Sequence, residues 1–293
     1  MHQKPVGFSL LPYLIALILF GGLVFGASAQ ETTASSELGD SIFLDNFSYS
    51  GTSLDISGET SNARATFWKP DGTVVFVVGR YSNNVAAYEL DDPWEISTAT
   101  FRQAMALPGR YQHGLYFREY GERMWVYDRT SIWSFDLDEP WDITTISEGE
   151  NTDLGDFVSR GHDIDFKSDG SMLFIDDRNT GAVFAIDLPV PWEVSSGSLS
   201  HTLDISHQQK AVRGIEFLQD GSVMILMDTG RDELLQYDLE EPYNILTARL
   251  VNTFDVSEQT HQGRGLSFNA DLTSFYVTGR NEEKIFQYDL VPE

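Results

Sequence analysis

Short apolar runs separated by polar turns recur along the chain, and no stretch has the periodicity of an amphipathic helix. The clearest runs are β-rich and follow an Asp-Gly or similar turn. They are Val74–Val78, Met124–Tyr127, Met172–Ile175, Val223–Met227 and Ser274–Val277. This pattern predicts an all-β protein built from short strands.

The same order of features repeats five times. Each copy has a phenylalanine anchor in an apolar segment, and these anchors are Phe67, Phe117, Phe166, Phe217 and Phe268, spaced by 50, 49, 51 and 51 residues. After the turn and the apolar run, each copy has a tripeptide similar to Tyr-Asp-Leu, and four copies continue into Pro-Trp or Pro-Tyr. Each copy offers three strands and a fourth closing run. Four strands in a repeat of about 40–50 residues are typical of a β-propeller blade.

The two ends of the chain indicate how the blades form a ring. The fifth copy ends soon after its third strand, at Glu293. A segment before the first anchor, Leu54–Ser57, matches the fourth-strand segments Leu203–Ser206 and Phe254–Ser257. We therefore expect an all-β, five-bladed propeller with four antiparallel strands per blade, whose last blade is closed by the N-terminal strand. Such closure removes an exposed sheet edge.

The pattern Phe-x-x-Asp-Gly…Tyr-Asp-Leu-x-x-Pro-Trp-Asp-Ile-x-Thr resembles the repeats of secreted bacterial β-propeller proteins, in the broad YVTN/NHL-like group. The resemblance covers residues 50 to 293 and implies the propeller fold. That group mixes lactonases, lyases and binding scaffolds, so the resemblance implies no particular activity. No catalytic motif of any one member is matched, and no functional residue is carried over.

Residues 1–29 have the pattern of a cleaved signal peptide. Lys4 precedes an apolar run from Phe8 to Phe25, and Ala27-Ser28-Ala29 supplies the small residues of a cleavage site. An uncleaved anchor is the alternative, because the apolar run is nearly long enough to span a bilayer. We interpret residues 30–46 as a polar lead-in and 47–293 as the propeller. We expect a secreted protein, extracellular or periplasmic, with no membrane insertion after cleavage.

Composition and charge exclude several classes of site. The chain has no cysteine, so disulfides, thiolate metal sites and cysteine nucleophiles are excluded. Without residues 1–29, which carry Lys4 alone, 18 basic and 45 acidic side chains remain, a net charge of −27. This charge disfavours nucleic acid and anionic membranes as partners. No loop has a calcium-binding spacing, so no metal or cofactor is predicted, although a Ca²⁺ ion in the channel stays open.

Residues common to all blades are expected to serve the blade, and residues that break the repeat are candidates for a site. The common set includes an arginine after each second strand, expected to pair with a carboxylate such as Asp128, Asp177 or Asp228. These arginines are Arg80, Arg129, Arg178, Arg231 and Arg280. The position four before each anchor varies, as Ala63, His113, His162, Arg213 and Arg264. The position just before the anchor also varies, as Thr66, Tyr116, Asp165, Glu216 and Ser267.

The first strand of each propeller blade lines the central channel, and its leading loop opens on one face together with the loop between strands two and three. Of the 18 basic residues, 12 fall in these two sets of loops. This distribution predicts a cationic patch that suits carboxylate, sulfate or phosphate. The binding candidates are Arg64, Arg110, His113, Arg160, His162, Arg213 and Arg264. We predict a secreted module that binds an anionic extracellular ligand, such as an acidic polysaccharide or surface glycan, at this mouth.

Two other functions stay open, and the sequence does not decide whether the protein is an enzyme. An extracellular hydrolase or lyase acting on a carbohydrate or lactone would use His113, His162, Asp165 and Glu216 at the same mouth. A structural scaffold for protein interactions at the cell surface would present a contiguous apolar patch. Convergence of the four polar residues on one pocket would favour the enzyme, and their dispersal would favour binding or structure.

Overall fold

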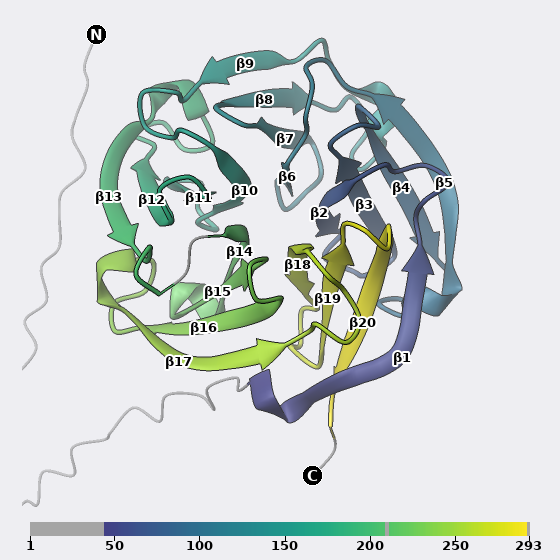
Figure 1. The fold of residues 1–293 in the computed structure, drawn as a ribbon. Coiled ribbons are helices and arrows are strands. Elements are labelled where there is room, and N and C mark those ends of the chain that lie inside the picture. Colours follow the sequence, from purple (N-terminus) through teal and green to yellow (C-terminus); the bar gives the residue numbers. More distant parts are fainter. Residues whose placement is uncertain (1–43, 209–210, 292–293) are drawn as a thin grey trace, which may run out of the picture. The chain divides into compact units, whose positions relative to one another are not determined.

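The computed structural model describes residues 44–208 and 211–291. The predicted signal peptide, most of the lead-in and Lys210 lie outside these residues. In the part that is described, 20 strands form five separate four-stranded sheets, each antiparallel, around a central axis (Figure 1). This is the five-bladed β-propeller that the repeat predicts.

The first strand of each blade lies nearest the axis and the fourth lies outermost (Figure 1). Blade one comprises β2 (Ala63–Trp68), β3 (Val74–Gly79), β4 (Asn84–Leu90) and β5 (Ala99–Ala106). Blade two comprises β6 (Gly114–Phe117), β7 (Arg123–Asp128), β8 (Ser131–Asp136) and β9 (Glu150–Asp153). Blade three comprises β10 (Gly161–Phe166), β11 (Met172–Asp177), β12 (Ala182–Asp187) and β13 (Ser198–Asp204). Blade four comprises β14 (Val212–Leu218), β15 (Val223–Asp228), β16 (Glu233–Leu239) and β17 (Ala248–Asp255).

Blade five combines the two ends of the described chain. Its strands are β18 (Gly263–Phe268), β19 (Ser274–Gly279), β20 (Lys284–Leu290) and β1 (Phe47–Asp55). Leu54 pairs with Ile285 and Asp55 with Lys284, so the predicted closure by the N-terminal strand is confirmed. A short 3₁₀ turn, η1 (Leu44–Asn46), precedes β1. Similar turns lead into the fourth strands of blades one to four, and these are η2 (Ile96–Thr98), η3 (Ile143–Thr145), η4 (Val194–Ser196) and η6 (Ile245–Thr247).

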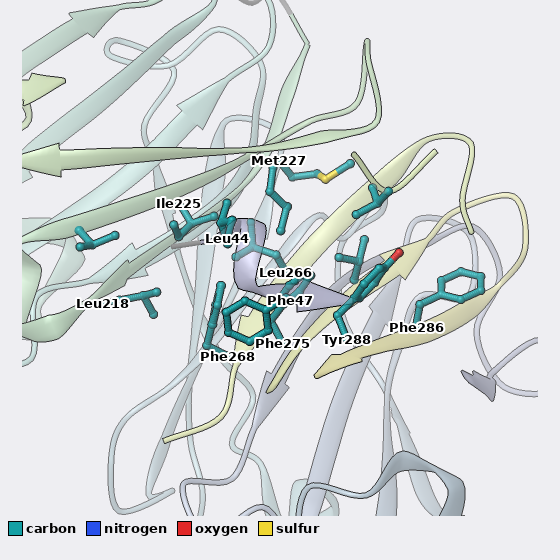
Figure 2. Close-up of a cluster of buried hydrophobic side chains, with 14 residues drawn as sticks. Leu44, Phe47, Leu218, Ile225, Met227, Leu266, Phe268, Phe275, Phe286 and Tyr288 are labelled. Carbon is teal, nitrogen blue, oxygen red and sulfur yellow. The ribbon is translucent and has the colours of Figure 1, made fainter. Parts of the chain in front are cut away.

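The closing strand is also held by hydrophobic packing. Leu44 and Phe47 lie in a buried cluster with residues of blade five and with Leu218 and Ile225 of blade four (Figure 2). The ring centres of Phe47 and Phe275 are 5.1 Å apart. Burial of each such side chain stabilises the fold by about 1.5–3 kcal/mol, so both hydrogen bonds and packing hold the ring closed.

The proline-aromatic dipeptides serve the blade, as the repeat suggests. Gly72 in the turn of blade one has φ of +73°, and a Cβ at this position would lie 2.4 Å from the ring of Trp94. The same close packing places an aromatic ring over the turn glycine in blades two, three and four. Blade five has Leu272 at this position of the turn, and no proline-aromatic dipeptide follows it. A glycine therefore stands in the turn of each blade in which an indole or phenol ring covers that turn.

Blade one is offset by one residue from its expected alignment. Trp68 pairs with Val75 at the start of the second strand, as Phe268 pairs with Phe275 in blade five. Trp68, and not Phe67, is therefore the structural equivalent of the other anchors. The residue four before the anchor in this blade is Arg64 instead of Ala63, and the residue just before it is Phe67 instead of Thr66.

Candidate functional site

A cavity of about 340 Å³ opens at the predicted end of the channel. It is bounded by the leading loops and first strands of the blades and by residues that follow the second strands. Seven arginines line it: Arg64, Arg80, Arg160, Arg178, Arg213, Arg264 and Arg280. We call this cavity the arginine mouth.

The basic residues of this region come from two equivalent positions in the blades. With the corrected alignment, the position four before each anchor forms an inner ring of Arg64, His113, His162, Arg213 and Arg264. The residue that directly follows each second strand forms an outer ring of Arg80, Arg129, Arg178, Thr229 and Arg280. Blade four departs from the outer pattern, because Thr229 takes this position and Arg231 lies two residues further on, with 60% of its side chain exposed.

The arginines of the mouth form no salt bridge with any acidic side chain that the structure describes. Among the described residues, no carboxylate oxygen lies within 4.0 Å of a guanidinium nitrogen of any of the seven. The acceptors are uncharged: the Asn62 side chain accepts from Arg64 at 2.6 Å, and the Gln262 side chain accepts from Arg264 at 2.8 Å and also from Arg280. The backbone carbonyl of Gly263 also accepts from Arg264, at 3.4 Å. The positive charges of the arginines therefore face one another across the cavity.

Burial makes this accumulation of charge costly. Arg64, Arg213 and Arg264 are only 4%, 9% and 1% exposed, and their Nε atoms are buried without a hydrogen-bond partner. Burial, and then the charge of the neighbouring arginines, lowers the pKa of all three guanidinium groups. Arginine stays protonated in proteins, so the lowered pKa values indicate a strongly positive site. A bound anion would stabilise it.

The outer-ring arginines were expected to pair with the aspartates that end the second strands, and blades two and three show a different arrangement. Both oxygens of Asp177 accept backbone N–H groups, including those of Ser159 at 2.7 Å and Arg160 at 2.9 Å. Asp128 accepts the backbone N–H of Arg110 at 3.3 Å. These carboxylates hold the leading loops, which leaves the Arg178 side chain to line the cavity. The pairing expected from the sequence is therefore wrong for these two aspartates.

Two tyrosines stand beside the arginines at blades one and two. The Cζ atoms of Arg80 and Arg129 lie 4.8 and 4.0 Å from the ring centre of Tyr111. Tyr81 is 54% exposed, and its ring lies 6.3 Å from that of Tyr111, edge to face. Cation–π contacts thus position two arginines, and Tyr81 adds an exposed aromatic side chain. Arg110 itself does not line the cavity.

His113 and His162 lie together in the inner ring. Their ring centres are 4.6 Å apart, both residues are buried, and His162 lines the cavity. Burial lowers the pKa of both imidazoles, and the nearby arginines lower that of His113 further. Both rings are neutral at pH 7. Both nitrogens of His113 and Nδ1 of His162 have no hydrogen-bond partner.

Asp165 and Glu216 lie elsewhere, so the four residues expected to form one catalytic group do not converge. The two carboxylates line a second cavity, which contains neither histidine nor any arginine of the mouth. Asp165 accepts the backbone N–H groups of Phe166 and Phe217, each at 2.7 Å. Glu216 accepts that of Phe268 at 3.2 Å. Each carboxylate thus connects its blade to the first strand of the next.

Residues 44–208 and 211–291 contain no group of three or more histidine, aspartate or glutamate side chains that could hold a metal ion. Over the same residues, no helix is long and apolar enough to cross a bilayer.

The arginine mouth presents N–H donors with positive charge, which is the donor chemistry of an anion site.

No known family profile matches the sequence, and no curated protein sequence matches it. Among solved structures, a functionally unknown protein from Desulfotomaculum acetoxidans is 11% identical, with a TM-score of 0.45 over 75% of this chain and 63% of that one. The β-propeller domain of Cps50 (Swd1) from Myceliophteria thermophila is 8% identical, with a TM-score of 0.48 over 82% of this chain and 100% of that one. This chain thus spans less than two thirds of the first protein's length. Likenesses this distant carry no argument about the site.

Proposed function

We propose that the protein is a secreted binding module that captures an anionic ligand in the arginine mouth. The observation that carries this proposal is the group of seven arginines around one cavity with no carboxylate partner among the described residues. The chain as a whole has an excess of acidic residues. Burying a charged group without a partner of opposite charge is energetically costly. Because acidic residues are abundant in this chain, guanidinium groups buried without one indicate that a ligand supplies the negative charge.

The proposed ligand is small or binds by its end. A volume of about 340 Å³ is near the lower limit of small-molecule sites. The buried imidazoles of His113 and His162 complete the inner ring and carry no positive charge, so the guanidinium groups supply the charge that an anion would meet. Several arginines can offer paired N–H donors to one carboxylate, sulfate or phosphate group, and each charge-assisted hydrogen bond contributes about 1.5–3 kcal/mol. The exposed ring of Tyr81 suits the apolar face of a sugar. We therefore favour the acidic terminus of an extracellular glycan.

Three further predictions made from the sequence are part of this proposal. Membership of the secreted YVTN/NHL-like group, export to the periplasm or the outside of the cell, and a surface glycan as partner all fit an anion-binding module. Asp165 and Glu216 line a different cavity from His162, and His113 lines neither, which disfavours the hydrolase or lyase that would use the four residues together. The net charge continues to disfavour nucleic acid.

Isothermal titration calorimetry of residues 30–293 with galacturonate, digalacturonate, inorganic sulfate and neutral galactose tests the proposal. We expect the acidic probes to bind, more weakly at high salt, and galactose not to bind. The double variant Arg213→Gln/Arg264→Gln should lose binding by at least about tenfold, since it removes two of the buried donors.

The matched control is Arg102→Gln/Arg249→Gln, which makes the same change in net charge at two exposed positions of the outermost strands β5 and β17. It should bind as the unmodified protein does. Failure of every acidic probe to bind, or equal binding by the Arg213→Gln/Arg264→Gln variant, would overturn the proposal.

A further inference from the structure

A second cavity, of about 380 Å³, is lined by the positions just before the blade anchors. With blade one correctly aligned, these five residues are Phe67, Tyr116, Asp165, Glu216 and Ser267, and all five line the cavity. They come three residues after the inner-ring positions on the same first strands. Three residues of strand span about 10 Å, which separates this cavity from the arginine mouth along the channel. We call it the aromatic cavity.

Aromatic rings surround the aromatic cavity. The rings of Phe67 and Tyr116 are 5.2 Å apart, and those of Tyr116 and Phe166 are 4.9 Å apart. Trp94 and Tyr243, which cover the turns of blades one and four, extend the wall outward. Aromatic faces carry negative electrostatic potential and attract cations.

The ionisable side chains that line this cavity are acidic, whereas those of the arginine mouth are basic. No basic side chain among the described residues lies within 4.0 Å of Asp165 or Glu216. The basic residues near the turns of blades one to three already have partners. Those ion pairs are Lys69–Asp71 at 2.6 Å, Arg118–Glu122 at 3.1 Å and Lys167–Asp169 at 2.9 Å.

One carboxyl oxygen of Glu216 is available to a ligand. Its Oε1 accepts the Phe268 N–H, which fixes the carboxylate, while its Oε2 is buried without a hydrogen-bond partner. Burial, followed by the nearby Asp165 charge, raises the pKa of Glu216, and burial raises that of Asp165 to about 7. Both shifts favour the neutral carboxyl groups while no cation is bound, and a cation in the cavity would favour their ionised forms.

We propose that the aromatic cavity binds an organic cation, specifically a quaternary or methylated ammonium group, between the aromatic rings and the carboxylates of Asp165 and Glu216. Aromatic side chains make up most of the lining and offer few hydrogen-bond acceptors, which suits a methylated nitrogen better than a primary ammonium with three N–H donors to satisfy. The excess of acidic residues in the chain would raise the local concentration of such a cation.

The test is calorimetric titration of the full mature chain with choline, and with 3,3-dimethylbutan-1-ol, in which carbon replaces the charged nitrogen. We expect choline to bind, and the neutral analogue to bind at least about tenfold more weakly. Glu216→Gln keeps the Oε1 acceptor and the shape of the side chain but cannot ionise when a cation binds. It should weaken choline binding by about tenfold.

Glu240→Gln is the matched control, since it makes the same change in charge on the exposed surface, and it should leave choline binding unchanged. The Arg213→Gln/Arg264→Gln variant should also bind choline normally, which separates this site from the arginine mouth. If Glu216→Gln does not fold, Asp165→Asn makes the same test. The proposal is overturned if choline does not bind, if the neutral analogue or glucose binds equally well, or if a folded carboxylate variant keeps full affinity.

Discussion

The guanidinium carbon of Arg129 lies 4.0 Å from the ring centre of Tyr111, on the loop that leads into β6. Arg80 from blade one approaches the same ring at 4.8 Å, so one phenol ring positions two arginines from neighbouring blades. The backbone of Tyr111 has φ of +70°, which is uncommon for a bulky residue and indicates that surrounding contacts hold it there.

We expect Tyr111→Ala to weaken anion binding by about two- to fivefold, because Arg80, which lines the arginine mouth, loses one cation–π contact of about 0.5–1 kcal/mol. Tyr111→Phe keeps the ring and should bind normally. Tyr120→Ala, at a side chain that is 67% exposed, is the control for loss of a surface tyrosine. Calorimetry with digalacturonate measures all three, and normal affinity of Tyr111→Ala would remove this residue from the site.

Arg264 should reduce the stability of the ligand-free protein. It is 1% exposed, the charges of Arg213 and Arg64 act on it, and it forms no salt bridge with a described acidic residue. We expect Arg264→Met, which keeps most of the side-chain volume, to unfold at the same temperature as the unmodified protein or higher in chloride buffer. Sulfate at equal ionic strength should raise the melting temperature of the unmodified protein and have less effect on the variant. A variant that is much less stable in chloride would show that the guanidinium contributes structure instead.

The buried carboxyl of Asp165 should make stability depend on pH. Burial raises its pKa to about 7 in the folded protein, so between about pH 4 and 7 the folded state keeps a proton that the unfolded chain has lost. The stability that Asp165 contributes is therefore greatest at low pH and falls as pH rises through this window.

Relative to Asp165→Asn, the free energy of unfolding of the unmodified protein should fall by up to about 1.4 kcal/mol per pH unit from pH 4 to 7. His113 and His162 have lowered pKa values and act with the opposite sign. The difference between the two proteins cancels their effect. Urea unfolding at several pH values provides the measurement, and a difference that does not vary with pH would contradict the prediction.

Gly72 and Gly51 form a matched pair for the role of the turn glycines. Both have positive φ, of +73° and +88°, but a Cβ on Gly72 would lie 2.4 Å from Trp94, whereas one on Gly51 would meet nothing within 4 Å. We expect Gly51→Ala to cost about 1 kcal/mol from backbone strain alone, and Gly72→Ala to cost at least about 2 kcal/mol more through overpacking. Equal costs in thermal or urea unfolding would mean that the indole ring moves aside freely.

The sequence determined the blade repeat, the number of blades and the closure by the N-terminal strand. Each blade repeats the same turns and apolar runs, and local preferences for turns and strands are strong enough to appear in every copy. The concentration of arginine in two sets of loops was also visible, because equivalent positions in the blades repeat at a nearly constant spacing.

Only the tertiary structure decided the composition and position of the two cavities. Phe67 and Trp68 are both aromatic, so the alignment of blade one depended on strand pairing, which brings Arg64 instead of Ala63 into the inner ring. Asp177 accepts backbone N–H groups instead of an arginine, a choice that depends on how the leading loop folds back. His162 and Asp165 are three residues apart in sequence, yet the extended geometry of β10 directs them to different cavities. Side-chain chemistry alone identified the candidate residues, and the strand register determined which of them meet.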